Sequence, residues 1–149
     1  KTYLKKGYTP EWINQRLKSI EIRKALTNEW EKHGAKEGIE FAILTDEISK
    51  AWAGLTTKQY KNLKGLKKES LRDNMTNLEL VLNMLAETAT TEISQNENPD
   101  TFQKNKTIAK RGGNVAGVAR RKVEKEIGRS VISKANYLKK PEEQKTIKS

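Results

Sequence analysis

The sequence predicts an all-α protein built as one multi-helix domain, and three observations point to this class. Apolar residues recur at intervals of three and four in several segments, which is the spacing of an amphipathic helix. Ser or Thr stands where these segments begin, and Gly stands where they end. The apolar fraction of 34% and the charged fraction of 33% indicate a lean core under an ionic surface. At 149 residues the chain has room for one such core.

Residues 9–33 predict a long first helix. Thr9 is a good N-cap, and Pro10 suits the first helical position because its missing N–H would have no partner there. Gly34 ends the helix. The apolar residues at helical spacing are Ile13, Leu17, Ile20, Ile22, Leu26 and Trp30, with Trp12 beside them.

Two short helices are predicted next, over 45–53 and from Thr56 or Thr57 to Leu63. Thr45 resembles an N-cap, and acidic residues follow it in the first turn, where they suit the helix dipole. The run 39–44 is either extended or the lead-in to that helix. The pair, joined by a turn containing Gly54, resembles a helix-turn-helix at the coarsest level, although any compact helical protein contains such a pair.

Residues 71–95 predict a central helix, with Ser70 as its N-cap and Asp73 at the third position. Two interpretations fit its apolar stripe: a core helix, which is the more frequent case, or a seam for self-association. The stripe consists of Leu71, Met75, Leu78, Leu82, Leu85, Ala89 and Ile93. The predicted core is formed by this helix, the first helix and Trp52 of the 45–53 helix, and consists of Trp12, Leu17, Ile20, Trp30, Trp52, Leu78, Leu82 and Leu85.

A polar break at 96–100 separates residues 1–100, the helical core domain, from a basic extension over 101–138 packed on the same domain. Residues 101–128 predict a long basic helix split near Gly112, because Gly112 and Gly113 each cost about 1 kcal/mol relative to Ala inside a helix. Residues 139–149 are expected to form a flexible tail.

The charge of the chain is concentrated after the break. Residues 1–100 carry 16 Lys and Arg against 15 Asp and Glu, whereas residues 101–149 carry 14 against 4. A helix of this charge would displace counterions from a nucleic-acid backbone, although solvation of an exposed helix explains a charge run equally well. The candidate nucleic-acid-binding residues are Lys104, Lys110, Arg111, Arg120, Arg121, Lys122, Lys125 and Arg129.

Small residues gather in the middle of the same helix. Gly112, Gly113, Ala116 and Gly117 leave one edge of it almost without side chains. Such an edge allows a second helix to approach closely, which is the more frequent cause, or allows a phosphate backbone to lie against the main chain.

Residues suited to catalysis or to metal and cofactor binding are scarce. The chain has no cysteine, and its single histidine, His33, falls at a predicted helix end. No phosphate-binding glycine loop, dinucleotide fingerprint or nucleophile elbow is present, so neither an enzyme nor a cofactor is expected. With no membrane-spanning stretch or signal peptide, we expect a cytoplasmic protein without a membrane partner.

Several strings resemble one known group over about residues 3–138. They are Gly7–Lys18, Tyr60–Met75, Asn77–Glu87, Thr90–Ile93 and Gly112–Arg120. They resemble the C-terminal region of the bacterial DNA-damage-inducible protein D family, which overlaps with phage-antirepressor-like proteins carrying an N-terminal BRO domain.

The resemblance implies a BRO-type domain upstream of this chain, a role in the DNA-damage (SOS) or prophage response, and no enzymatic activity. The leading hypothesis is therefore a regulator that contacts single- or double-stranded DNA through the basic helix. The alternative is an oligomerisation and docking module that acts on a recombinase or repressor through the 71–93 stripe, with a homodimer as the form that self-association through this stripe would give.

Overall fold

The computed structural model describes residues 2–135, and within this range the chain is helical without a strand. The all-α prediction is confirmed. The predicted tail, 139–149, lies outside the described residues. The elements are α1 (Thr2–Lys5), α2 (Pro10–Lys32), α3 (Ile39–Ala53), α4 (Thr57–Leu63), the 3-10 turn η1 (Arg72–Asn74), α5 (Asn77–Glu97) and α6 (Phe102–Ile127).

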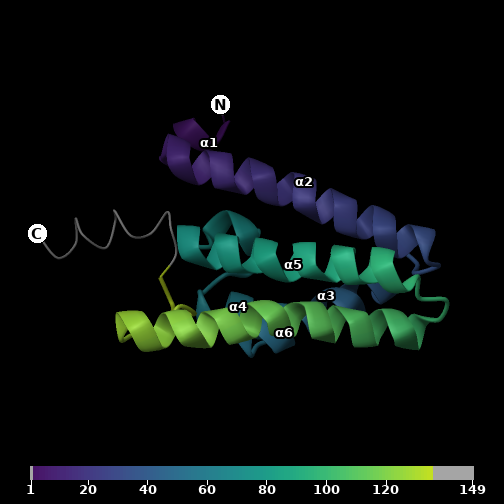
Figure 1. Ribbon diagram of the computed structural model, residues 1–149. Helices are drawn as coiled ribbons and strands as arrows, with labels where there is room; N and C mark the ends of the chain where they lie inside the picture. Colours follow the sequence, from purple (N-terminus) through teal and green to yellow (C-terminus); the bar gives the residue numbers. More distant parts are fainter. Residues whose placement is uncertain (1, 136–149) are drawn as a thin grey trace, which may run out of the picture.

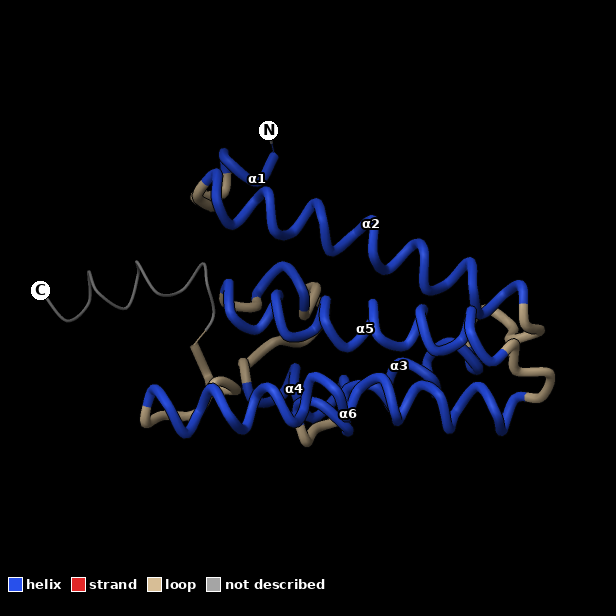
Figure 2. The backbone as a smooth tube through the Cα atoms, in the orientation of Figure 1, coloured by secondary structure: helices blue, strands red, loops and turns tan. Residues whose placement is uncertain are grey.

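The three longest helices lie side by side, with α5 between α2 and α6 (Figures 1 and 2). The shorter helices α3 and α4 lie behind this row in Figure 1. Because α3 packs against both α5 and α6, the core fills the space between α3 and the row. The C-terminal helix is thereby part of the same core as the rest of the chain.

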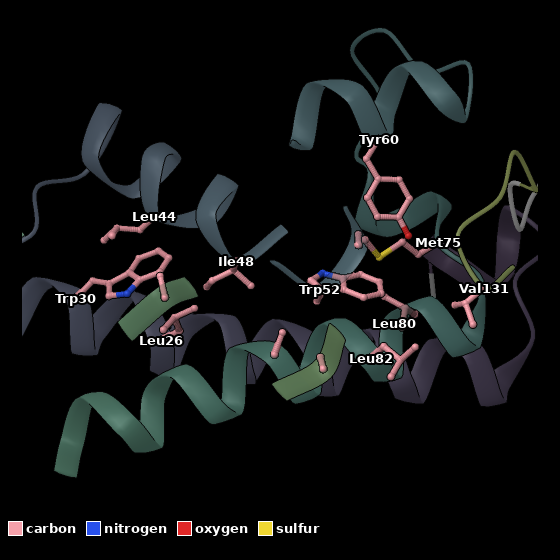
Figure 3. Close-up of a cluster of buried hydrophobic side chains, with 14 of the residues drawn as sticks. Leu26, Trp30, Leu44, Ile48, Trp52, Tyr60, Met75, Leu80, Leu82 and Val131 are labelled. Atoms are coloured by element: carbon pink, nitrogen blue, oxygen red, sulfur yellow. The ribbon is translucent and has the colours of Figure 1, made fainter. Parts of the chain in front are cut away.

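The core is centred on the three tryptophans, which are all buried, as predicted. Figure 3 shows Trp30 beside Leu26 and Leu44 at one end, and Trp52 near Met75 at the other. The predicted core residue Leu82 is also buried, and Leu78 is partly buried against the same cluster.

Three residues predicted for the core are instead exposed: Leu17 at 50%, Ile20 at 42% and Leu85 at 38%. In α2 the face turned inward is a different stripe, spaced at four and three, made of Trp12, Arg16, Ser19, Arg23, Leu26 and Trp30. Its polar members can be buried because each has a partner. Arg16 Nε lies 2.7 Å from the Asp73 carboxylate, and Arg23 contacts Glu87.

Some of the helix starts predicted from the sequence are confirmed, and others are wrong. Thr9 caps α2 as predicted, and Thr56 caps α4 in a capping box with Gln59. The predicted start at Thr45 is wrong, because α3 already begins at Ile39. Thr45 lies inside α3, where its hydroxyl donates to the Phe41 carbonyl oxygen over 2.7 Å.

The predicted single helix over 71–95 is also wrong at its start. Ser70 accepts the Asp73 N–H over 3.3 Å, but this bond closes only the η1 turn. Met75 is extended, with its carbonyl oxygen accepting the Trp12 indole N–H over 2.9 Å. Helix α5 then starts from a second cap, Thr76, which forms a capping box with Glu79.

The break expected near Gly112 is absent, since α6 runs without interruption from the Thr101 cap to Gly128. Gly128 ends the helix at a φ of 75°, a left-handed conformation that suits glycine. Each central glycine lies directly against a neighbouring helix, at a position where a side chain would not fit. This close packing keeps the helix intact.

Candidate nucleic-acid interface

The inner face of α6 is made of small residues pressed against α3 and α5. A Cβ on Gly112 would lie 1.9 Å from Thr90 Oγ1, and one on Gly113 would lie 2.6 Å from the Ile48 carbonyl oxygen. A Cβ on Gly117 would lie 2.5 Å from the Ala51 carbonyl oxygen, and Ala116 is fully buried. The small-residue edge is therefore occupied by helices of the same chain, so it is closed to a phosphate backbone.

Three predicted cations on the outer face of α6 are held in ion pairs. Lys104 Nζ lies 2.9 Å from Asp100, and Lys122 Nζ lies 3.0 Å from Glu126. Arg111 donates two hydrogen bonds, of 2.8 and 2.7 Å, to the carboxylate of Glu97 at the end of α5. Hydrogen bonds from Arg111 and Lys104 lower the pKa of Glu97 and of Asp100, respectively. This face was predicted to be cationic, and its charge is largely compensated.

Arg120 belongs to the structure of the fold rather than to an open surface. Its Nε donates to the Trp52 carbonyl oxygen over 2.6 Å, and its Nη1 donates to both Glu124 oxygens at 2.9 and 3.0 Å. Only 17% of its side chain is exposed. Glu124 also accepts the Val131 N–H over 2.9 Å, so Arg120 connects the end of α3 to the segment that follows α6.

A second row of cations on α6 has no carboxylate partner within residues 2–135. It consists of Lys106, Lys110, Arg121 and Lys125, which we call the α6 stripe. At 100° per residue the four share an arc of about 100°, turned about 100° away from the ion-paired face. Lys106 is half-buried and the other three are exposed. The stripe is about 28 Å long at 1.5 Å per residue.

The other charges around Lys110 of the α6 stripe compensate each other. Lys110 lies with Glu47, Lys50 and Ala51 around a hollow of about 240 Å³ between α3 and α6. Glu47 and Lys50 compensate each other, with 3.3 Å between Oε2 and Nζ. Arg129, the last of the predicted cations, is exposed beyond the Gly128 cap. Of the eight predicted cations, the structure thus leaves Lys110, Arg121, Lys125 and Arg129 without an ion pair in the described range.

A buried charge cluster that sequence reasoning missed lies between α2 and α5. Arg72 contacts both oxygens of Glu87, at 3.0 and 2.8 Å, and Arg23 NH1 lies 3.0 Å from the second oxygen. Burial alone would raise the pKa of Glu87, but the two guanidinium groups outweigh it and hold that pKa below its ordinary value. Burial lowers the pKa of Arg23. The available signal was that Glu87 shares a helical face with the apolar residues Leu80 and Met84, seven and three positions before it.

A second buried carboxylate, Glu79, joins the start of α5 to the end of the described chain. It accepts a hydrogen bond from the Tyr60 hydroxyl and lies 2.7 Å from Lys64 Nζ. Lys64 also donates to the carbonyl oxygens of Ser133 and Ala135. Burial, followed by the charge of Glu79, raises the pKa of Tyr60. The capping-box pattern Thr76-x-x-Glu79 was visible in the sequence and could have located this site.

Other predicted features have a plain structural role or line a hollow. The predicted helix-turn-helix is α3, the connection 54–56 and the seven-residue α4, whose Lys58 and Lys61 border a cavity. The ring of His33 contacts Glu29, with 2.8 Å between Nε2 and Oε1.

In residues 2–135 no group of carboxylates and histidine is placed to hold a metal ion. No helix of this range has the length and hydropathy needed to cross a bilayer.

Comparison of the chain with protein-family models, with curated proteins and with solved structures gives no match. The resemblance to the DNA-damage-inducible protein D family therefore stays a prediction from the sequence strings.

Proposed function

We propose that the chain is a non-enzymatic, nucleic-acid-associated regulator that contacts DNA phosphates through the α6 stripe. The role in a damage response rests on the resemblance of the sequence strings alone. The contact with phosphates rests on the charges of α6.

The observation that carries the proposal is the row of four uncompensated cations on one arc of a straight helix. Each Lys or Arg that neutralises a phosphate releases condensed counterions, and this release drives binding. A stripe of about 28 Å matches the rise of roughly eight nucleotides along one strand of a duplex. A cation already paired with a carboxylate must first lose that partner, so the ion-paired face contributes less.

The proposed contact does not read sequence. Base readout needs Arg, Asn or Gln aimed at base edges in a groove, whereas three of the four stripe residues are lysines. We therefore expect similar affinities for DNA of different sequences. Recognition of a specific DNA sequence would require another domain or a partner.

A matched pair of charge reversals tests the proposal. The double variant Lys110→Glu/Lys125→Glu alters the α6 stripe, and Lys104→Glu/Lys122→Glu alters the ion-paired face by the same net charge. Binding to single- and double-stranded oligonucleotides is measured at 50 mM salt, and circular dichroism checks the fold. We expect the stripe variant to lose at least about tenfold more affinity than the control, since it removes phosphate contacts and adds repulsion.

Equal losses in the two variants would mean that only net charge matters and would contradict the role of the stripe. Negligible binding of the unmodified chain at 50 mM salt would remove the proposal altogether.

The alternative function, docking or self-association through the 71–93 stripe, has only part of that stripe available, since Leu85 is 38% exposed. Met75 and Leu82 are buried, and Leu71 and Leu78 pack against the core of the same chain. Sedimentation tests this alternative, because a clean monomer at high concentration would count against a seam on α5.

A further inference from the structure

A partly enclosed chamber of about 230 Å³ lies where α2, α3, α4 and α5 meet the loop that carries η1. The side chains of Ile48, Trp52 and Met75 form its apolar wall, and Figure 3 shows these three in the core beneath Tyr60. The remaining lining is polar and rich in hydrogen-bond donors. The groups that matter for a ligand are Arg23, Arg72, Lys61, Asn83, Thr57 and Ser70.

The chamber lining carries more positive than negative charge. Arg23, Arg72 and Lys61 face a single carboxylate, Glu87. Glu87 accepts from both arginines, and Arg23 NH2 also donates to Thr45 over 2.7 Å. A guanidinium has five N–H donors, so these bonds leave donors of both arginines unused. Two positive charges of the lining thus have no compensating partner in it.

Asn83 gives a second, independent sign of a ligand. It lines the chamber, is only 6% exposed, and its Nδ2 has no hydrogen-bond partner within residues 2–135. Buried amide groups are nearly always hydrogen-bonded, because a buried donor without an acceptor costs free energy. An acceptor oxygen of a ligand inside the chamber would supply the hydrogen-bond partner that the Asn83 Nδ2 lacks.

The approach to the chamber is also cationic. An outer cavity of about 730 Å³ shares Arg23, Thr57 and Lys61 with it and adds Lys58 and Lys67. Asp46 is the carboxylate of this outer lining, and its Oδ1 accepts the Thr57 N–H over 3.0 Å. Phe41 and Leu66 provide apolar surface beside these charges. A cleft with such walls raises the local concentration of anions.

We propose that the chamber binds the phosphate group of a small phosphorylated molecule, whose remaining atoms lie in the outer cavity. A phosphate offers several acceptor oxygens and up to two negative charges, which match the donors and the uncompensated charge of the lining. The chamber is smaller than the roughly 300–1,000 Å³ of sites for drug-sized ligands, so only the charged group enters it. The site lies apart from the α6 stripe, and this proposal does not depend on DNA binding.

Inorganic phosphate and glycerol 3-phosphate are the probes of the first experiment, each compared with chloride at equal ionic strength and pH 7. The thermal midpoint of the full chain should rise with either phosphate in a saturable way, since a ligand that binds only the folded state stabilises it. The side-chain amide signal of Asn83 in a nitrogen–proton spectrum should shift over the same concentration range. Stabilisation no greater than with chloride would overturn the proposal.

Variants then place the binding. Asn83→Leu removes the free donor at similar volume, and Lys61→Gln removes one charge at a position that is not in the core. Each should weaken phosphate binding about tenfold or more, and the signal assigned to Asn83 disappears in the first variant. Lys125→Gln is the control with an equal charge change on α6 and should bind phosphate as the unmodified chain does.

Two further outcomes decide against the proposal. Equal weakening in Lys125→Gln and Lys61→Gln would mean that phosphate responds only to net charge. Binding of inorganic phosphate without binding of the ester would contradict the part that places the rest of the ligand in the outer cavity.

Discussion

Two regions of the molecule are rich in cations, but in one the cations are paired inside the fold and in the other most of them lie at the surface. Between α2 and α5, Arg23 and Arg72 are partly buried and form ion pairs with the fully buried Glu87. On α6 most cations remain at the surface, with Arg120 as the exception, and only those with a carboxylate one turn away, or on a neighbouring element, are paired. The comparison shows that the availability of a cation follows from its neighbours, which the count of Lys and Arg does not reveal.

The two regions also differ in what their ion pairs contribute to stability. Removing one partner of a buried pair leaves an uncompensated charge in a medium of low polarity. An exposed pair is screened by water and salt, and its loss is barely felt. Variants that remove one charge from each region test this difference.

The largest effect is expected for Glu87→Gln. The substitution keeps the shape but leaves Arg23 and Arg72 without their shared counter-charge, so the free energy of unfolding should fall by about 3–5 kcal/mol. Urea denaturation measures it. Glu126→Gln, which removes the partner of Lys122 at the surface, is the matched control and should leave the midpoint nearly unchanged. A loss below about 1 kcal/mol in Glu87→Gln would show that the buried pair is not stabilising relative to a neutral side chain.

A smaller effect is expected for Gly113→Ala on the inner face of α6. The new Cβ would lie 2.6 Å from the Ile48 carbonyl oxygen and 2.7 Å from Ala51 Cβ, so α3 and α6 must move apart. This overpacking costs about 1–3 kcal/mol, against a gain of about 1 kcal/mol from the better helix propensity of Ala.

Asn114→Ala, at the exposed neighbouring position, separates the two contributions. It should leave stability unchanged or raise it slightly, because it gains helix propensity without a contact. If Gly113→Ala were as stable as Asn114→Ala, the close approach of α6 to α3 would be wrong.

The smallest effect concerns pH. Arg72 and Arg23 hold the pKa of Glu87 below its ordinary value of 4.5. A depressed carboxyl pKa contributes stability that is present above the ordinary value and is lost as pH falls through the folded-state value. The unmodified chain should therefore lose stability over this acidic range more steeply than Glu87→Gln, as chemical denaturation at several pH values would show. Parallel curves for the two proteins would contradict the assigned cause of the shift.

Local signals in the sequence predicted the helical class, the cap Thr9, a cap at Thr56 or Thr57, and the buried tryptophans. The inner face of α2 could not be found from apolar spacing, because Arg16 and Arg23 occupy it. Both are partly buried through ion pairs with Asp73 and Glu87, which are distant in the chain. The start of α5 was obscured by Ser70, which offers a competing cap six residues before Thr76.

The candidate interface was predictable only in outline. The excess of cations after residue 100 was visible, and so were carboxylates four residues away from three of them. The contacts of Arg111 with Glu97 and of Arg120 with Trp52 were not, since these partners lie on other elements. The expected break at Gly112 failed for a similar reason. Helix propensity penalises glycine, and the packing that offsets this penalty involves α3 and α5.

The most direct test of the account counts the phosphates that the chain contacts. The slope of log affinity for duplex DNA against log salt concentration equals about −0.9 per contact. The four free cations of the α6 stripe predict a slope near −3.6, a loss of about 10²-fold between 50 and 200 mM salt. A slope near −7, as for all eight cations first expected from the sequence, or a slope near zero would contradict the claim that the four cations of the α6 stripe supply the phosphate contacts.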